Sequence, residues 1–372
     1  MHIVQYIPGT TPPPAYGGIE RIGFWITREL TKRGHRLTVI TNEESTIEEE
    51  VPGVRMVRIP TVDRWDVIPS PGEWDYRDLI PADADLVHFH AALPLDSLPE
   101  TPFLVTEHGI RPKVYTDTTR FHGHAPNTVF VSRSHARNHG GEIFVYHGVP
   151  LDEYPLRTEK DDFMLFMAAL GWRGKNAKTA IHLSFDTGMP IKLAGGDLTK
   201  NRRMRGAWMA RAPFHKSLLE GVGMVSGQRK LDLLQKARLL FYLVGWEEPF
   251  ALAPHEALAC GTPVLGSFGA LREYIREGEN GFIASTYREA LARVRQVMTM
   301  DPEQLESMAR RCRQSAYRIE DCVTGYLELY ERVLRDRWLY PPEQARALYL
   351  RLNSRRLRPG NRRIRRYPFK LG

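Results

Sequence analysis

Short runs of Val, Ile, Leu and Phe recur along the chain and are separated by polar or helical stretches. Several of these runs do not alternate with polar residues, which is typical of parallel strands covered on both faces. In the first half we expect strands at residues 2–7, 37–41, 54–59, 86–90, 103–106, 128–132 and 144–146. The second half predicts strands at residues 163–170, 191–194, 223–225, 239–244 and 263–265.

Helical periodicity occupies the stretches between these strands. Ile19, Ile22, Ile26 and Leu30 lie on one side of an amphipathic helix predicted from Gly18 to Arg33. Further helices are expected at residues 177–184, 228–237, 254–260 and within 302–340. Two successive arrays of alternating strands and helices predict an α/β protein with two parallel-sheet domains, at residues 1–155 and 156–325.

The stretch from Glu247 to Leu265 carries the strongest candidate chemistry. A buried strand is followed by a loop with Glu248, and a short helix with Glu256 is stopped by Gly261. The first N–H groups of such a helix have no partner within the helix and favour a negatively charged ligand. Carboxylates that accept hydroxyl groups beside a phosphate-binding helix end are what a nucleotide-sugar site requires.

Other nucleotide motifs are absent from the sequence. The loop after the first strand runs from Pro8 to Gly18 and contains no GxGxxG, and no GxxxxGK[ST] loop occurs anywhere. These absences count against a dehydrogenase and against a nucleoside triphosphatase.

Composition adds a cellular setting and one unusual segment. Hydrophobic residues make up 42% and charged residues 26% of the chain, and there are three cysteines. With no apparent signal peptide and no long apolar run, we expect a cytoplasmic protein without structural zinc. The net charge of +8 arises in the tail of residues 346–372, where nine Lys or Arg fall between Arg351 and Lys370. This tail predicts either peripheral contact with anionic membrane or a solvated segment, and we expect no nucleic-acid partner.

Six segments together resemble one known family, the retaining family-four, or group 1, glycosyltransferases. These segments are residues 16–21 (YGGIER), 85–90 (DLVHFH), 106–109 (TEHG) and 147–152 (HGVPLD), the neighbourhood of Lys175, and the Glu248-x7-Glu256 block. The resemblance implies the GT-B fold, in which two Rossmann-like domains face a cleft. It also implies that a helix at residues 326–345 crosses back to the first domain.

The same resemblance implies a reaction and a set of site residues. A sugar is transferred from a nucleoside diphosphate sugar to an acceptor hydroxyl without a cofactor or metal, with UDP-glucose our first expectation and GDP-mannose our second. The implied catalytic residues are His108, Lys175 and Glu248. The implied donor-binding residues are Gly17, Gly18, Arg173, Lys175, Glu248, Phe250, Ala251, Leu252 and Glu256.

Two positions depart from the family pattern. Leu170 stands where the family usually has Arg, so Arg173 is the candidate substitute. Ala251 stands where the family usually has Gly, and its methyl group is expected to be a small perturbation.

Other functions stay open at this stage. They are a nucleotide-sugar epimerase or hydrolase on the same fold, a catalytically silent sugar-nucleotide-binding protein, and an RNA-binding protein with a degenerate enzyme body. His88 and His90 share one face of a strand, where structural or acceptor-side roles are favoured over a metal pair. The arginines between Arg202 and Arg211 predict either a phosphate-contacting loop or a solvated one.

Overall fold

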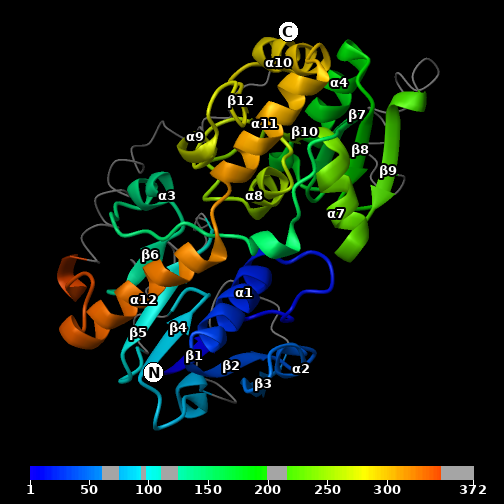
Figure 1. Cartoon of the computed structure of the whole chain (residues 1–372). Coiled ribbons are helices and arrows are strands. Elements are labelled where there is room, and N and C mark those ends of the chain that lie inside the picture. The colour runs from blue at the N-terminus through cyan, green and yellow to red at the C-terminus, as the bar shows by residue number, and fades with distance from the viewer. Residues whose placement is uncertain (61–74, 94–97, 110–124, 199–215, 345–372) are drawn as a thin grey trace. The chain divides into compact units, whose positions relative to one another are not determined.

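The computed structural model describes residues 1–60, 75–93, 98–109, 125–198 and 216–344. The chain divides into two compact units (Figure 1). Of the described residues, the first unit comprises Met1–Gly148 and residues 318–344, and the second comprises Val149–Tyr317. The basic tail and the cluster from Arg202 to Arg211 lie outside the described residues.

The first unit is built on a six-stranded parallel sheet with the order β3-β2-β1-β4-β5-β6. Its strands are β1 (His2–Tyr6), β2 (Arg36–Asn42), β3 (Arg55–Ile59), β4 (Leu86–Phe89), β5 (Phe103–Glu107) and β6 (Thr128–Phe130). The central strands β1 and β4 are buried along their whole length, including the polar side chains of Gln5 and His88, as strands covered on both faces are. One core cluster joins Val4, Tyr6, Val87, Phe89 and Phe103 across the sheet.

The second unit repeats the same topology. Its strands are β7 (Asp161–Met167), β8 (Ile191–Ala194), β9 (Leu219–Gly223), β10 (Ala237–Tyr242), β11 (Val264–Gly266) and β12 (Gly281–Ile283). Their order is β12-β11-β10-β7-β8-β9, and all pairs are parallel. Each sheet therefore has the strand order of a Rossmann-like domain, which confirms the predicted α/β fold.

Helices lie between the strands of each unit. They are α1 (Gly18–Lys32), α2 (Ile47–Glu50), α3 (Arg133–Asn138), α4 (Ala177–Thr187), α7 (Gly227–Lys236), α8 (Leu252–Ala259), α9 (Leu271–Tyr274), α10 (Tyr287–Met298), α11 (Pro302–Ser315) and α12 (Ile319–Asp336). Single turns of 3₁₀ helix occur at η1 (Tyr76–Leu79), η4 (Leu151–Glu153), η5 (Arg173–Lys175) and η6 (Lys216–Leu218). Among the helices of the described residues, none is long and apolar enough to cross a membrane.

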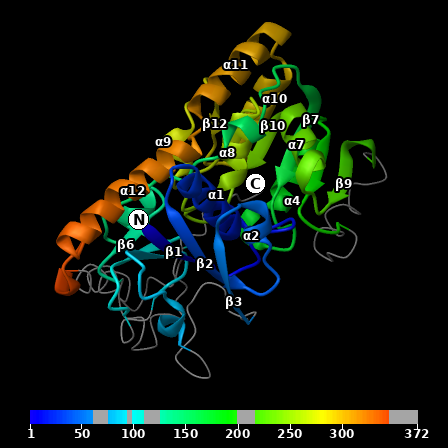
Figure 2. The same ribbon diagram turned by 60° about the horizontal axis from the view of Figure 1, so that its bottom comes forward.

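The last helix belongs to the first unit. Figures 1 and 2 show α12 lying alongside α1, and the two helices are in contact. The buried face of α1 contains Ile22, Ile26 and Leu30 of the predicted stripe together with Trp25, whereas Ile19 is only partly buried. Arg33 at the end of α1 fixes the pair, because its guanidinium donates to the carbonyl of Glu320 at 2.7 Å.

Several elements differ from the sequence-based expectation, and the helices α2, α3, α9 and α10 were not predicted. The helical stretch within 302–340 is two helices, interrupted at Ala316–Arg318. Residues 144–146 form only an isolated bridge between Phe144 and Phe130. The edge strands of the second sheet are β9, which ends at Gly223 rather than starting there, and β12, which was not predicted. Edge strands are short and receive less burial, so their hydrophobic pattern is weak.

Candidate active site

In both sheets, candidate residues follow the carboxyl ends of the two central strands. In a Rossmann-like sheet, ligands bind at the carboxyl ends of the strands where the strand order reverses. In the second unit this reversal lies between β7 and β10, and the loops after these strands carry Lys175 and Glu248. In the first unit it lies between β1 and β4, and the following residues include Gly17 and His90.

Lys175 and Glu248 form a buried ion pair in the second unit. The Lys175 Nζ lies 2.8 Å from Glu248 Oε2, and each side chain is only 7% exposed. Tyr242, at the end of β10, accepts a hydrogen bond from Lys175 at 2.7 Å and donates to Glu248 at 3.2 Å. A buried charge needs a partner of this kind. The ion pair of Lys175 and Glu248 therefore joins the loop after β7 to the loop after β10.

Aromatic rings surround the same ammonium group. The Lys175 Nζ lies 5.1 Å from the ring centroid of Trp172, 4.9 Å from that of Tyr242 and 5.0 Å from that of Trp246. These distances are typical of cation–π attraction. Trp246 also donates its Nε1–H to Glu248 at 2.9 Å. Neither tryptophan was a sequence-based candidate, because their proximity depends on two loops that are far apart in the chain.

Glu256 has partners that the sequence did not indicate. It is 2% exposed on α8, where Lys230 of α7 lies 2.5 Å from its Oε1 and Tyr154 donates to it at 2.8 Å. Lys230 is 26 residues and Tyr154 is 102 residues away in sequence, so no local spacing connects the three. A carboxylate held by a cation and a hydroxyl is well placed to accept further hydroxyl groups.

The turn that leads into α8 is strained at the position where the family usually has glycine. Ala251 precedes the helix with φ 74° and ψ 114°, in a region that a residue with a Cβ rarely adopts. The expectation of a small perturbation therefore understated the effect of the methyl group. Tyr274 stabilises the turn by donating to the carbonyl of Phe250 at 2.9 Å, and Leu252 is the first residue of α8.

Arg173 and Leu170 differ in their surroundings. Leu170 is buried, with 3% exposure, so the position of the usual family arginine is part of the core. Arg173 begins η5 with an exposed side chain, two residues before Lys175. Arg173 is therefore accessible to an anion, and its role as the substitute cation stays a prediction.

The Gly17–Gly18 loop of the first unit is held by side chains on both sides. Gly17 has φ 155°, and a Cβ at this position would lie 2.8 Å from the carboxylate of Glu20. Burial raises the pKa of the Glu20 carboxyl, which lies in the first turn of α1. Arg21 donates to the carbonyl of Ala15 at 3.1 Å. The loop is therefore an ordered segment at the start of α1.

Hydroxyl groups from β2 and the turn after it hold the other end of this loop. Thr41 donates to the carbonyl of Gly9 at 2.8 Å, and the backbone N–H of Thr11 donates to Ser45 at 2.9 Å. Thr41 and Ser45 are themselves 2.9 Å apart.

His108 is the middle member of a histidine chain in the first unit. Its Nε2 lies 3.0 Å from His90 Nδ1, and its Nδ1 lies 3.2 Å from His147 Nε2. Both ring nitrogens are thus engaged, so contact between His108 and a ligand through nitrogen requires one of these bonds to open. Burial lowers the pKa of His108 well below its ordinary value, and the neighbouring His147 and His90 lower it further.

His88 connects this chain to α12. Its ring is tilted against that of His90, with centroids 4.2 Å apart. Its Nδ1 lies 2.8 Å from the Tyr330 hydroxyl, and its Nε2 lies 2.7 Å from Thr106. These contacts give His88 a structural role, which the sequence analysis favoured over a metal-binding pair with His90. In the described part of the chain, no group of three or more His, Cys, Asp or Glu side chains is arranged to hold a metal ion.

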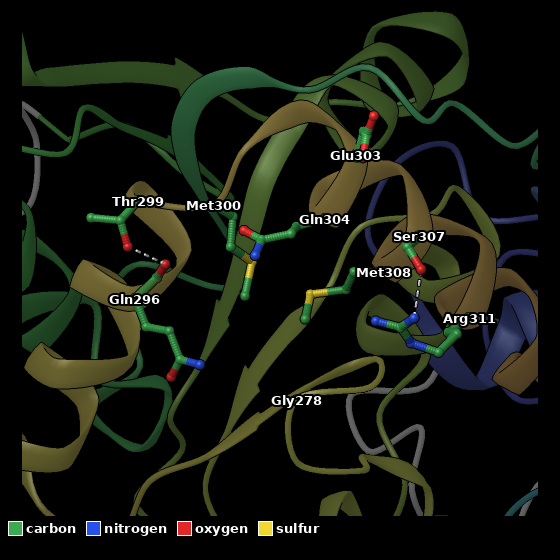
Figure 3. A pocket seen from close by; sticks show the side chains of 9 residues that line it. All are labelled: Gly278, Gln296, Thr299, Met300, Glu303, Gln304, Ser307, Met308 and Arg311. Carbon is green, nitrogen blue, oxygen red and sulfur yellow. Dashed lines mark hydrogen bonds between the residues drawn. The ribbon is translucent and has the colours of Figure 1, made fainter.

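A separate hollow of about 620 Å³ lies elsewhere on the second unit. Figure 3 shows Met300 and Met308 in its middle, with Gln296 and Arg311 at its two sides. Gly278 also lines it and precedes β12, so the hollow lies at the amino ends of the strands. The candidate residues follow the opposite, carboxyl ends, and the hollow is therefore not part of the candidate site.

The sequence of the chain is similar to those of known glycosyltransferases. The family model described as glycosyl transferases group 1 matches residues 214–318, and the model of glycosyltransferase family 4 matches residues 16–152. A curated relative from Bacillus anthracis, N-acetyl-alpha-D-glucosaminyl L-malate synthase, is 32% identical over 102 residues. That match covers 26% of this chain and spans 27% of the relative's length.

Solved structures share the fold over nearly the whole chain. AviGT4, a glycosyltransferase involved in avilamycin A biosynthesis, has a TM-score of 0.64 at 22% identity and covers 90% of this chain and 98% of its own. HepE from Anabaena, solved in complex with UDP-glucose, has a TM-score of 0.67 at 14% identity. The match covers 90% of this chain and 99% of the HepE chain. On these sequence matches and this shared GT-B fold, the chain belongs to the group 1, family 4 glycosyltransferases.

Proposed function

We propose that the protein transfers a sugar from a nucleoside diphosphate sugar to an acceptor hydroxyl, with retention at the anomeric carbon. The observation that carries this proposal is the buried ion pair of Lys175 and Glu248 in the loops that follow β7 and β10, together with the buried Glu256 on α8. Lys175 and the first N–H groups of α8 offer positive charge to a diphosphate. Glu248 and Glu256 offer acceptors for the hydroxyl groups of the sugar and of the ribose.

The chemistry assigned to these residues is the stabilisation of a leaving group. The bond between the anomeric carbon and the diphosphate oxygen breaks, and the acceptor oxygen bonds to the same face of that carbon. The acceptor proton passes to the departing phosphate. Lys175 stabilises the charge that develops on this phosphate, which is the type of contact that accelerates the step. We assign the donor to the second unit and the acceptor to the first, with Gly17, Gly18 and His108 as candidate contacts.

UDP-glucose is our first proposal for the donor, and GDP-mannose is the second. HepE from Anabaena, whose fold this chain shares, was solved with UDP-glucose, which supports the first choice. The protein needs no metal in this proposal, because Lys175 and the helix start carry the charge of the diphosphate.

The donor assignment is tested by thermal shift with UDP, UDP-glucose, GDP and GDP-mannose. A ligand that binds only the folded protein raises the midpoint of unfolding, and the rise grows with the logarithm of its concentration relative to Kd. We expect Glu248→Gln to weaken the binding of the sugar nucleotide and abolish transfer, while Glu273→Gln, on the short helix α9, serves as the matched control. The absence of any shift with all four compounds in the wild-type protein would contradict the proposal.

Product analysis separates this function from its rivals. A transferase releases the nucleoside diphosphate only when an acceptor is present, and its product keeps the anomeric configuration of the donor. Rapid release of free sugar or of an epimer without acceptor indicates a hydrolase or an epimerase. Tight donor binding without turnover across a broad acceptor panel indicates a catalytically silent binding protein.

A further inference from the structure

Trp172 presents an indole ring to solvent beside the candidate diphosphate site. Its side chain is 42% exposed, whereas Trp25 in the first unit is 2% exposed. Exposed large apolar side chains in the described residues also include Tyr16, Met224, Met298 and Leu334, but Trp172 is the one that contacts Lys175. An exposed aromatic ring at the edge of a polar site is typical of ligand recognition.

The ring is held in place by its neighbours. Trp172 and Trp246 meet edge to face, with centroids 4.4 Å apart and an interplanar angle of 78°. The Lys175 ammonium lies 5.1 Å from the ring centroid. Trp172 is therefore ordered by contacts on one side while its remaining surface is accessible.

The surrounding contacts indicate which part of the donor meets this ring. Trp172 contacts Lys175, the residue proposed for the diphosphate, and its partner Trp246 donates to Glu248, the residue proposed for the transferred sugar. Glu256, proposed for the ribose, is bound instead by Lys230 and Tyr154. The ring thus adjoins the sugar end of the donor and not the nucleoside end.

We propose that Trp172 is a stacking platform for the ring of the transferred sugar, an inference that rests on the proposed function. A pyranose has a face of C–H groups that are polarised by the ring oxygen and the hydroxyls. Such a face is attracted to the negative π face of an indole, and its contact removes apolar surface from water. The platform offers the donor a contact at the end of β7, where the buried Leu170 offers no charge.

The test compares the affinities of UDP and UDP-glucose for the wild-type protein and three variants by titration calorimetry. We expect Trp172→Ala to weaken UDP-glucose binding about five- to tenfold and to leave UDP binding within about twofold. Trp172→Phe retains a ring and should recover most of the lost affinity. Met224→Ala removes another exposed apolar side chain from the second unit and should change neither affinity. GDP and GDP-mannose replace the uridine pair if the wild-type protein prefers them.

Fluorescence gives a second readout that a purely structural role would not produce. Quenching of tryptophan emission by the sugar nucleotide, beyond that caused by the nucleoside diphosphate, should disappear in Trp172→Phe. Equal losses of affinity for UDP and UDP-glucose in Trp172→Ala would overturn the sugar assignment, as would unchanged affinity for both. If the wild-type protein binds none of the four nucleotides, the proposed function is overturned as well. That outcome is distinguishable from failure of the Trp172 assignment alone, in which the wild-type protein still binds a nucleotide.

Discussion

The backbone conformation at Ala251 costs conformational free energy that a glycine would avoid. With φ at 74°, its Cβ crowds the neighbouring peptide groups, and conformations of this kind cost on the order of 1–3 kcal/mol. The turn persists because Tyr274 holds the carbonyl of Phe250 and α8 follows at once. The strain is located where the candidate site presents the N–H groups of the helix start.

Replacing Ala251 by Gly should therefore stabilise the protein. Relief of strain outweighs the added entropy of glycine in the unfolded chain, and we expect the free energy of unfolding to rise by about 1 kcal/mol. The measurement is urea unfolding monitored by circular dichroism. Ala292→Gly is the matched control, because Ala292 is exposed in the interior of α10 and the same change there should cost about 1 kcal/mol. Destabilisation of equal size at both positions would show that Ala251 is not strained.

At the level of elements, α12 contributes side chains to the interior of the first sheet. Tyr326 and Tyr330 are fully buried, and their hydroxyls lie 3.1 Å from Thr106 and 2.8 Å from His88. His88 in turn lies against His90, with ring centroids 4.2 Å apart. The helix is therefore a structural part of the histidine chain, although 242 residues separate Tyr330 from His88.

Removing the Tyr330 hydroxyl should destabilise this element. Tyr330→Phe leaves the Nδ1 of a buried histidine without its partner, which costs about 1–3 kcal/mol. The free energy of unfolding in urea is the measurement. Tyr287→Phe provides the control, since the Tyr287 hydroxyl bonds Asp186 at the protein surface and its loss should change stability by about 0.5 kcal/mol or less. Similar losses in the two variants would argue against the buried network.

For the molecule as a whole, buried neutral histidines make stability depend on pH. Burial lowers the pKa of His90 to about 3 and that of His135 to about 4, and it lowers those of His88 and His108 well below the ordinary value. All four lie in the first unit. Below pH 6.5 the unfolded chain binds protons that the folded unit does not bind. Stability is therefore complete above pH 6.5 and declines as the pH falls towards 4.

Between pH 6.5 and the lowered pKa of each such histidine, we expect every decrease of one pH unit to lower the free energy of unfolding by about 1.4 kcal/mol per histidine. Urea unfolding at pH 7, 6 and 5 measures the slope, and His90→Asn should reduce it more than His35→Asn, which alters a half-buried residue. Hydrogen exchange at pH 5 should show the first unit opening before the second, in which His255 has a pKa lowered to about 3. A slope near zero would contradict the neutral state assigned to these rings.

The candidate site could be predicted only in part from the sequence. Glu248, Glu256 and Lys175 were found because they stand in local motifs on a strand–loop–helix unit, and the structure brings Glu248 and Lys175 into contact. Trp172 and Trp246 were not found, since their meeting depends on how the loops after β7 and β10 pack. Lys230 and Tyr154 were missed for the same reason.

The sequence predicted the alternation of buried strands and amphipathic helices, because strands that are buried on both faces of a parallel sheet consist largely of apolar residues. It did not determine the split between α11 and α12, the short edge strands or the conformation of Ala251. Nor did it determine the partners of each buried charge and ring. Those were decided by tertiary packing, since a buried charge or histidine is satisfied by whichever group the fold brings within hydrogen-bond distance, regardless of separation along the chain.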